Sequence, residues 1–522
     1  MINSELMPHL ADIPRVQAEQ RPDETAFLYK GDATSFAELN ARSNQVGHGL
    51  RSLGIGPGTR VGYLAKNTSI YYEMMFGAAK IRAVMNAVNT RLAPPEVQFI
   101  LSDANVSLLF VGAEFYDLID EIKDQLPELT TIIALDAPHA DWPLYADWRD
   151  HQERTAPGIT THGEDDVIQL YTSGTTGLPK GVMLTNNNYL AFFRQAGQLA
   201  WSSYDSGDAV LNAMPLFHVA GVNVGILAAA QGAKTIVLPE IDPGEILRLV
   251  EEERINHAFW VPAVILILTQ HPNFLKTDFS SLKQVFYGAS PIAEALLKTA
   301  VDVMGARFTQ LYGITETVGA GTYLPPEAHD PAKGKLRSCG IPYPDAQVRC
   351  VDETGQDVAT GEVGEIVIKA GFVMKGYWNR PDATEEAIQN GFFYTGDAGY
   401  FDEDGFLYIH DRVKDMIVSG GENVYPAEVE NAIFSHPDVA DVAVIGVPDE
   451  KWGEAVKALI VPKPGCDPSA ADIITWARER IAGYKCPKTV EQISELPRNP
   501  SGKILRKDLR EPYWANQARR VS

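Results

Sequence analysis

The sequence predicts an α/β fold: a large N-terminal domain of layered α/β sheets plus a β-rich lobe, followed by a small α+β C-terminal domain. Three observations support this prediction. Short β-branched runs alternate with segments of helical periodicity through roughly the first four hundred residues, which is typical of largely parallel sheets covered by helices. Near residue 340 the pattern changes to strand, turn and strand. The last part of the chain holds further strand and helix patterns, enough for a compact domain of roughly a hundred residues.

The expected elements follow the chain in this order. Residues 61–65 form an apolar run typical of a buried strand, and residues 71–84 carry apolar side chains at helical spacing. Further buried strands of the large domain are expected at residues 107–111, 131–135, 235–238 and 284–287. In the β-rich lobe we expect strands at 347–351 and 365–369, with a turn at 352–355. In the C-terminal domain we expect strands at 439–447 and 455–461, and a helix at 468–481.

The charge balance bears on the class of ligand. The 522 residues carry a formal net charge of -23, with 45% hydrophobic and 22% charged residues. Proteins that bind nucleic acid normally present a basic field, so this acidity argues against a nucleic-acid partner. A ligand that carries phosphate must therefore be held by a local site that overcomes the global charge.

No targeting segment, membrane span or zinc site is expected. The first residues lack a basic start followed by a long apolar run. The longest apolar run, residues 258–268, is too short to cross a bilayer, and Pro262 interrupts it. The four cysteines have no CxxC spacing and the histidines form no HExxH pattern. These features predict a cytoplasmic protein with reduced thiols.

The most informative segment is residues 171–181, with the sequence YTSGTTGLPKG. Its glycines let the backbone turn tightly, so that successive N–H groups can point at one anion, and its hydroxyl side chains add further donors. Lys180 adds a positive charge in a strongly acidic chain. The segment follows the apolar residues 167–170, so it is expected to leave the end of a strand, where α/β proteins place their ligands. This pattern predicts a polyphosphate-binding loop.

Other motifs for phosphate binding or hydrolysis do not fit the chain. The common nucleotide P-loop has a glycine directly before its lysine, whereas Pro179 occupies that position here. The sequence contains no GxGxxG fingerprint. The nucleophile motif GxSxG also fails, because residues 288–292 lack the second glycine. The remaining alternative for residues 171–181 is a flexible surface loop rich in glycine and threonine.

Residues 171–181 resemble the signature of the adenylate-forming superfamily, which includes acyl-CoA synthetases, peptide-synthetase adenylation domains and firefly luciferase. Further segments resemble motifs of that superfamily in the same order, so the resemblance spans essentially the whole chain. They are PLFH at 215–218, YGAS at 287–290, YGITET at 312–317, YTGD at 394–397, DRVKD at 411–415 and PSGK at 500–503. The resemblance implies an N-terminal domain of residues 1–411, a hinge at 412–415 and a small mobile C-terminal domain of residues 416–522.

The resemblance implies a site for ATP and Mg²⁺. The carboxylate of Asp397 would accept both ribose hydroxyls, and Glu316 would be a hard ligand for Mg²⁺. Lys503 would offset the repulsion between the α-phosphate and the attacking carboxylate, as the main catalytic residue. The other catalytic residues implied are Thr315, Glu316, Lys180 and Lys414. The residues implied for ATP or AMP binding are Thr172, Ser173, Gly174, Thr175, Thr176, Gly288, Ala289, Ser290, Tyr312, Gly313, Thr315, Asp397, Arg412 and Lys503.

Several of these residues have more specific expected roles. The ring of Tyr312 is expected to stack near the adenine, and Thr315 to lie beside the α-phosphate. Arg412 is expected to be a second ribose contact. Lys414, two residues beyond that arginine, is expected to be the pivot of the C-terminal domain. Outside these motifs, each residue would have an ordinary explanation, such as a core tyrosine or an exposed linker lysine.

The resemblance also places the acid and the thiol. The residues expected near the acyl group are His218, Gly221, Trp260, Val261 and Val318. The segment SGGENVYP at 419–426 resembles the CoA ligases in particular, in which Gly420 and Gly421 would line the tunnel for pantetheine. The apolar run at 264–268 has two interpretations, a tunnel lining or ordinary core, and core is the commoner one.

We therefore expect an acyl-CoA synthetase, which adenylates a carboxylic acid with ATP and forms a thioester with coenzyme A, releasing AMP and pyrophosphate. The low bulk of residues 318–321 favours a fatty acid, and an aryl, aryl-propenoic or short acid stays open. A peptide-synthetase adenylation domain is less favoured, because residues 214–226 contain no acidic side chain to hold an amino group. A luciferase-like oxygenase and a non-catalytic nucleotide sensor stay open, as does the choice between a monomer and a homodimer.

Overall fold

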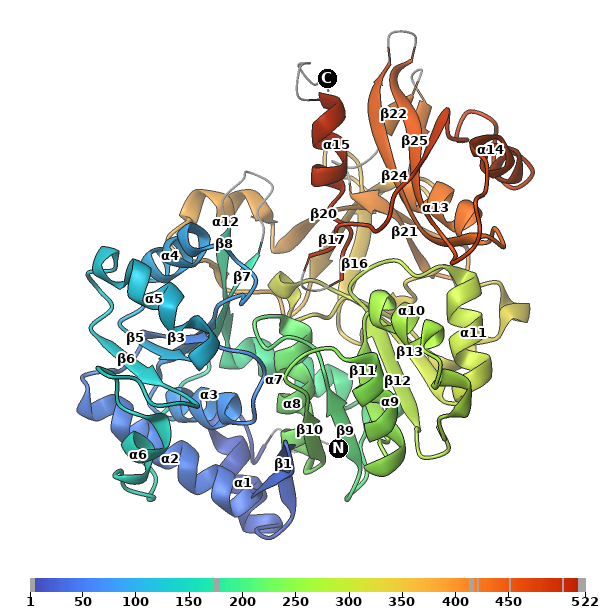
Figure 1. Ribbon diagram of the computed structural model, residues 1–522. Coiled ribbons are helices and arrows are strands. Elements are labelled where there is room, and N and C mark those ends of the chain that lie inside the picture. The colour runs from blue at the N-terminus through green and yellow to red at the C-terminus, as the bar shows by residue number, and fades with distance from the viewer. Residues whose placement is uncertain are drawn as a thin grey trace.

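A computed structural model describes residues 5–172, 179–412, 417–419, 422–449, 452–499 and 502–514. Figure 1 shows a large N-terminal body and, above it, a smaller C-terminal domain coloured orange to red. The predicted class, layered α/β sheets with a small C-terminal domain, is confirmed. The body is built on two mixed sheets, and the main hydrophobic core contains side chains from both of them.

The first sheet has seven strands in the order β18-β8-β7-β4-β3-β5-β6. The strands from β7 to β6 are parallel, whereas β8 is antiparallel to β7 and β18 is antiparallel to β8. The bounds are β3 (Arg60–Leu64), β4 (Val84–Ala87), β5 (Leu108–Val111), β6 (Thr131–Ala134), β7 (Asp166–Thr172), β8 (Lys180–Thr185) and β18 (Gly376–Tyr377). The strands predicted at 61–65, 107–111 and 131–135 are therefore present, to within a residue at each end.

The second sheet has nine strands in the order β15-β14-β13-β12-β11-β9-β10-β1-β2. Its middle strands are parallel, and β2, β14 and β15 pair antiparallel at the two edges. The bounds are β1 (Thr25–Tyr29), β2 (Asp32–Ser35), β9 (Ala209–Asn212), β10 (Lys234–Val237), β11 (His257–Trp260), β12 (Gln284–Gly288), β13 (Arg307–Tyr312), β14 (Thr322–Leu324) and β15 (Ile341–Pro342).

Helices cover these sheets, and one of them corrects a predicted boundary. The helix expected over residues 71–84 ends at Lys80, because Arg82 has a left-handed backbone with φ of 65° and Val84 begins the next strand. The helices of the body are α1 (Ile13–Gln20), α2 (Phe36–Ser52), α3 (Ile70–Lys80), α4 (Pro94–Asp103), α5 (Tyr116–Ile122), α6 (Tyr145–Asp150), α7 (Asn186–Ala196), α8 (Val219–Gln231), α9 (Pro243–Glu252), α10 (Pro262–Gln270), α11 (Glu294–Met304) and α12 (Pro381–Ala387).

The β-rich lobe is a separate antiparallel sheet at the top of the body. The predicted turn is present, with the Gly355 N–H donating to the Asp352 carbonyl over 2.9 Å. The sheet joins the predicted strands at 347–351 and 365–369 to a long strand and its neighbours. The bounds are β16 (Gln347–Val351), β17 (Gly364–Lys369), β19 (Ile388–Gln389), β20 (Phe392–Phe401) and β21 (Leu407–Arg412).

The C-terminal domain has its own hydrophobic core, separate from those of the body. Its predicted helix is shorter than expected, because the Ser469 side chain caps its first turn and the helix ends at Arg478. The strands are β22 (Ile417–Ser419), β23 (Glu422–Val424), β24 (Val439–Asp449), β25 (Gly453–Pro462) and β26 (Thr489–Gln492). The helices are α13 (Pro426–Phe434), α14 (Ala470–Arg478) and α15 (Arg506–Trp514).

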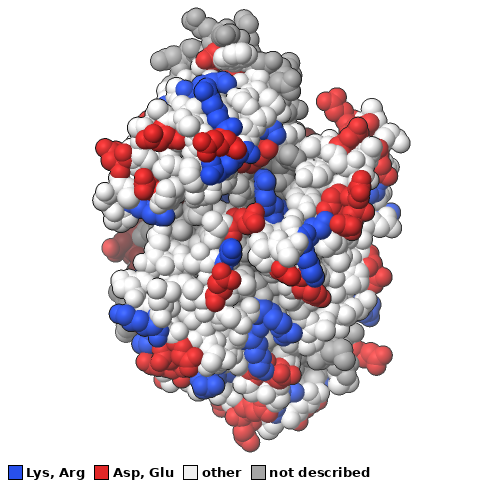
Figure 2. Space-filling model, turned by 90° about the vertical axis from the view of Figure 1, so that its right-hand side faces the viewer, with Lys and Arg blue, Asp and Glu red and all other residues white. Residues whose placement is uncertain are grey.

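Charged side chains of both signs lie on the surface (Figure 2). Over the face that Figure 2 shows, acidic and basic side chains are interspersed and no extended basic patch is visible. Within the described ranges, none of the helices combines the length and the apolar character that crossing a bilayer would need.

Candidate active site

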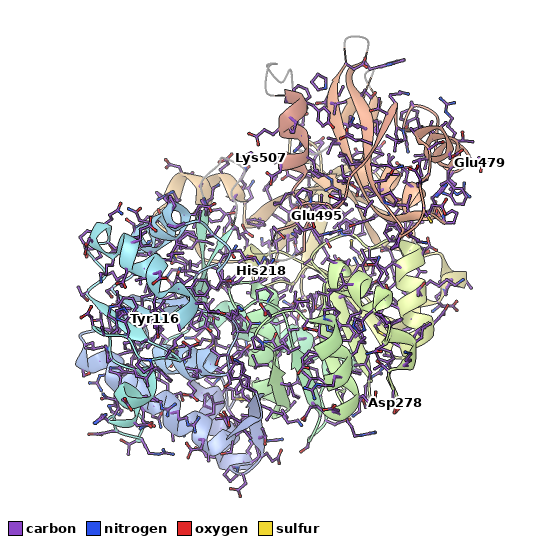
Figure 3. The ribbon with its side chains drawn as sticks, viewed as in Figure 1. Tyr116, His218, Asp278, Glu479, Glu495 and Lys507 are labelled. Atoms are coloured by element: carbon purple, nitrogen blue, oxygen red, sulfur yellow. The ribbon has the colours of Figure 1, made fainter. Side chains whose placement is uncertain are left out.

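A cavity of about 1930 Å³ lies between the N-terminal body and the C-terminal domain, and residues of both line it. Figure 3 shows His218 in the body below the C-terminal domain, with Lys507 at the foot of α15 above it. The cavity brings together many of the residues predicted from separate motifs. Those that line it are Thr172, Lys180, His218, Ala289, Ser290, Tyr312, Gly313, Thr315, Glu316, Val318, Asp397 and Lys503.

The expected phosphate loop joins two antiparallel strands. Thr172 ends β7, Lys180 begins β8, and the two residues are partners in the ladder. The segment does leave a strand end, as predicted, but the next element is a paired strand. Four predicted nucleotide-binding residues of this loop lie outside the described residues: Ser173, Gly174, Thr175 and Thr176. The ends of the loop are thus placed at the cavity wall.

Glu316 is fixed beside the ends of this loop. It lies in the short 3-10 helix η6 (Thr315–Thr317) and is only 8% exposed. Its Oε1 atom accepts hydrogen bonds from the Tyr377 hydroxyl at 3.0 Å and from Thr172 Oγ1 at 3.3 Å. Lys180 Nζ lies 4.9 Å from the centroid of the Tyr377 ring. One carboxylate, one ammonium and two hydroxyl donors therefore meet at a single place.

Tyr377 is a site residue that the sequence motifs did not indicate. Burial, and then the nearby Glu316 carboxylate, raise the pKa of Tyr377, so the phenol stays protonated and acts as a donor. It reaches the site because β18 pairs with β8, with Tyr377 opposite Val182. No sequence pattern predicts a pairing between a two-residue strand and a strand so distant along the chain.

The two residues expected to hold ribose lie on neighbouring strands. Asp397 of β20 is directly opposite Arg412 of β21 in the ladder. The Asp397 carboxylate accepts a hydrogen bond of 2.8 Å from the Tyr312 hydroxyl, and the Asp397 side chain is 8% exposed. Burial, and then the Asp397 charge, raise the pKa of Tyr312 well above its usual value. Tyr312 therefore orients Asp397, in addition to presenting its ring to the cavity.

Two glycines of the predicted nucleotide segments allow close backbone contact. A Cβ at Gly288 would lie 2.0 Å from the carbonyl oxygen of Leu311, and one at Gly313 would lie 2.3 Å from the carbonyl carbon of Gly319. Gly288 does not itself line the cavity, and its predicted nucleotide contact stays a prediction. It lets β12 lie against β13, so that Ala289, with φ of 68°, turns the chain into the cavity wall.

Three of the five residues predicted near the acyl group do not line the cavity. A Cβ at Gly221 would lie 2.1 Å from the Pro215 carbonyl oxygen, so this glycine serves helix packing. Trp260 is fully buried in a core behind the cavity, and Val261 is 3% exposed in the same core. The structure therefore does not bring these three residues to the cavity lining, and their contact with the acyl group stays a prediction.

The other two residues, His218 and Val318, do line the cavity. Val318 has a left-handed backbone with φ of 54°, which is strained for a β-branched residue. The amide of Asn223 holds it there: Nδ2 donates to the Val318 carbonyl at 2.8 Å, and Oδ1 accepts from the Tyr189 hydroxyl at 3.2 Å. Asn223, which the motifs did not indicate, thus connects the wall on α8 with the segment that carries Glu316.

The pKa of His218, a residue of the body, is affected by a lysine of the C-terminal domain. Burial, and then the positive charge of Lys503, together lower the pKa of His218 to about 4. The imidazole is therefore neutral at neutral pH. Lys503, from the C-terminal domain, lies close enough to His218 in the body for its charge to be felt there.

Lys503 is carried by a tight turn. Its backbone N–H donates to Asn499 Oδ1 at 2.8 Å, and the Asn499 N–H donates to the Lys503 carbonyl at 2.7 Å. Arg498 donates from Nη1 to the Gly502 carbonyl and from Nη2 to Asp441 Oδ2, each over 2.7 Å. The turn rests on the body: a Cβ at Gly502 would lie 3.0 Å from Ala263 Cβ and 3.2 Å from Val261 Cγ2. Val261 therefore supports this turn.

The remaining predicted residues lie where little can be described. Lys414 and the two predicted CoA-tunnel glycines, Gly420 and Gly421, lie outside the described residues. Arg412 is placed through its backbone. Within the described ranges, no group of three or more His, Cys, Asp or Glu side chains could hold a metal ion. A Mg²⁺ that arrives with ATP does not need such a group, because it is usually held by one or two carboxylates and by phosphates.

Comparison with known proteins agrees with this geometry. Residues 14–378 match the family model described as AMP-binding enzyme, and residues 428–503 match that of the AMP-binding enzyme C-terminal domain. A fatty acid–[acyl-carrier-protein] ligase of Streptomyces coeruleorubidus is 39% identical, over 97% of this chain and 96% of that protein. A long-chain-fatty-acid–CoA ligase of Mycobacterium tuberculosis is 38% identical, over 96% of each. A feruloyl-CoA synthase of Amycolatopsis is 37% identical, over 97% of this chain and 99% of that protein.

Solved structures of CoA synthetases and ligases are also similar to this chain over nearly its full length. A fatty acyl CoA synthetase of Mycobacterium tuberculosis is 37% identical with a TM-score of 0.76, over 98% of this chain and 99% of that one. An anthranilate CoA ligase in complex with anthranoyl-AMP is 28% identical with a TM-score of 0.91, over 98% and 99%. The two family models and the near full-length relatives together show that this chain belongs to the AMP-binding enzyme family, in the branch that contains the AMP-forming acid–CoA ligases.

Proposed function

We propose that this protein is an acyl-CoA synthetase that adenylates a fatty acid with ATP and then transfers the acyl group to coenzyme A. The observation that supports this most is the composition of the cavity: Lys503 of the C-terminal domain lines it together with Thr315, Glu316 and Asp397 of the body. The relatives named as fatty-acid ligases support the choice of acid.

The described residues suit the first step, in which the acid attacks the α-phosphate. Asp397, oriented by Tyr312, would accept the ribose hydroxyls and fix the nucleotide along the β20 edge. Lys503 would lie between the carboxylate and the α-phosphate, where its charge offsets their repulsion and stabilises the negative charge that builds in the transition state. His218, neutral beside this lysine, would border the acid without adding a second positive charge.

Glu316 is suited to bind the Mg²⁺ that accompanies ATP. Its carboxylate faces the ends of the phosphate loop, and its Oε1 is already held by Tyr377 and Thr172. When bound, Mg²⁺ would neutralise part of the phosphate charge. Lys180, at the other end of the loop, would supply a further cation for the polyphosphate.

The proposal is tested by the products of the reaction. With a suitable acid, ATP, Mg²⁺ and coenzyme A, the protein is expected to release AMP and pyrophosphate and to form an acyl-CoA. Chromatography of the nucleotides and mass spectrometry of the thioester measure this. Formation of ADP would contradict the proposal, because it would mean attack at the γ-phosphate. A parallel assay with an acyl carrier protein in place of coenzyme A decides between the two thiols, since relatives of both kinds are known.

The contact under Gly502 gives a second prediction. Gly502→Ala is expected to slow adenylation by roughly tenfold, because the new methyl group would press on Ala263 and Val261 when the Lys503 turn docks. Gly465→Ala is a matched control: both glycines have φ of 81°, but a Cβ at Gly465 would meet nothing within 4 Å. Pyrophosphate release measures adenylation in both variants. Equal slowing by the two substitutions would show that backbone strain, and not the domain contact, is responsible.

A further inference from the structure

One arm of the cavity is an apolar slot along helix α8. Ala220, Val224 and Leu227 line it, and their spacing places them on one face of the helix. Phe259 of β11 and Phe286 of β12 line the same cavity. The slot begins at His218, the residue that precedes the helix, and the charge of Lys503 acts on His218. A carboxylate at the reaction centre would therefore extend its hydrocarbon chain into this slot.

The far end of the slot is closed by an aromatic ring. Tyr204 lines the cavity, and its ring lies against His257, with 4.4 Å between the ring centroids. His257 is itself fixed, because its Nε2 lies 2.8 Å from Asp208 Oδ2. Trp201, which also lines the cavity, packs on Phe286 with ring centroids 5.8 Å apart. Packed aromatic rings therefore form the floor of the slot.

A glutamine at the end of α8 holds this floor in place. Gln231 Oε1 accepts a hydrogen bond of 3.1 Å from the Tyr204 backbone N–H, and Gln231 Nε2 donates over 3.1 Å to the Ser202 carbonyl. Gln231 lies one helical turn beyond Leu227 and is the last residue of α8. The two hydrogen bonds of the Gln231 side-chain amide thus connect the segment that carries Tyr204 to α8, the helix that lines the slot.

The helix gives the depth of the slot. From His218 to Leu227 is nine residues, which at about 1.5 Å per residue is roughly 13 Å. A saturated chain advances roughly 1.3 Å per carbon, given a C–C bond of about 1.5 Å at tetrahedral angles. An extended acyl chain of about eight to ten carbons would therefore fill the slot as far as Leu227 and Tyr204.

We infer that this slot measures chain length: it accepts linear acids of about eight to ten carbons, Leu227 and Tyr204 set the limit, and Gln231 positions Tyr204. The inference rests on the proposed function and adds the substrate class to it. Longer chains would have to displace packed rings, and shorter chains would leave part of the slot unfilled, so both are expected to react more slowly.

The test is the profile of kcat/KM for AMP formation over a ladder of straight-chain saturated acids from short to long. The wild-type profile is expected to peak at about eight to ten carbons and to fall by roughly tenfold or more for acids about four carbons longer. Leu227→Phe fills the slot and should move the peak to shorter acids. Tyr204→Ala removes the floor, and Gln231→Met removes both of its hydrogen bonds, so each should move the peak to longer acids.

Matched controls separate the slot from general effects. Leu118→Phe places the same bulk on α5, and Tyr116→Ala removes a tyrosine that, like Tyr204, packs against a histidine, here His139 at 5.2 Å between centroids. Both positions lie away from the cavity lining, and Figure 3 shows Tyr116 on the far side of the body from the C-terminal domain. Neither control is expected to move the peak.

Three results would decide the matter. A peak that keeps its position in both Leu227→Phe and Tyr204→Ala would overturn the inference while leaving the proposed function intact. If Tyr204→Ala does not fold, as thermal unfolding would show, Leu227→Phe still decides, because it changes the length limit in the opposite direction. A complete absence of AMP formation with every acid, aliphatic or aromatic, would overturn the proposed function and the length limit together.

Discussion

Replacing Lys503 with alanine is expected to slow acyl-adenylate formation by about a hundredfold or more, a loss of about 2.7 kcal/mol in transition-state stabilisation. The reason is electrostatic. The carboxylate and the α-phosphate are both anionic, and their approach concentrates negative charge in a site that is partly shielded from water. A lysine held between them offsets this repulsion, whereas alanine leaves it uncompensated.

The structure makes this prediction specific to one half-reaction. The turn that carries Lys503 is docked on Val261 and Ala263, with Lys503 lining the cavity that also holds His218. Under the proposed function, adenylation needs Lys503 in this position. Thioester formation requires a thiol to reach the same carbonyl carbon, so Lys503 should not be needed for it. The variant supplied with preformed acyl-adenylate and coenzyme A is therefore expected to form thioester at nearly the normal rate.

The measurements are pyrophosphate release for the first step and acyl-CoA formation from preformed adenylate for the second. Lys488→Ala is the control, because it removes one positive charge from the same domain at a position that does not line the cavity. Equal damage by Lys503→Ala to both half-reactions would count against the assigned role. An equal effect of Lys488→Ala would indicate a general loss of charge rather than a catalytic contribution.

Most of the described residues predicted to bind the nucleotide line one cavity, and they were found because they lie in short contiguous motifs. Asp397 and Arg412 come from separate motifs, and the antiparallel pairing of β20 with β21 places them opposite each other. Thr315 and Glu316 are adjacent in the chain, so a prediction for one carries over to the other. The alternation of strands and helices likewise predicted the sheets, since buried parallel strands are apolar along their length.

Fewer of the residues predicted near the acyl group line the cavity, for a physical reason. Trp260 ends a buried strand and Val261 follows it, and an apolar residue has the same sequence signature whether it faces a ligand or a core. Tyr204 and Gln231 lie in no motif, and their contact depends on where α8 ends relative to a distant loop. Tyr377 reaches Glu316 only through a strand pairing. Such contacts depend on tertiary packing, which cannot be read from the local sequence pattern.

Under the proposed function the same cavity serves two reactions, and this motivates the last prediction. Lys503 lines it now, yet the thiol has to approach the acyl carbon that Lys503 would face. A rigid-body rotation of the C-terminal domain resolves the conflict. The body ends with β21 at Arg412, and β22 of the C-terminal domain begins at Ile417, so a rotation has to be absorbed between these two residues. We propose Lys414 as the pivot, on the resemblance of residues 411–415 to a hinge.

Lys414→Pro is expected to abolish most acyl-CoA formation from preformed adenylate while leaving pyrophosphate release largely intact. A pivot must change its backbone dihedral angles between the two arrangements, and proline fixes φ near −65° and restricts the residue before it. The variant should therefore be held in one arrangement, and the docked Lys503 turn indicates the adenylating one. Lys414→Ala is the control, because it removes the charge and keeps the backbone free, so it should form thioester at close to the normal rate. A proline variant that forms thioester as fast as the wild type would show that Lys414 is not the pivot.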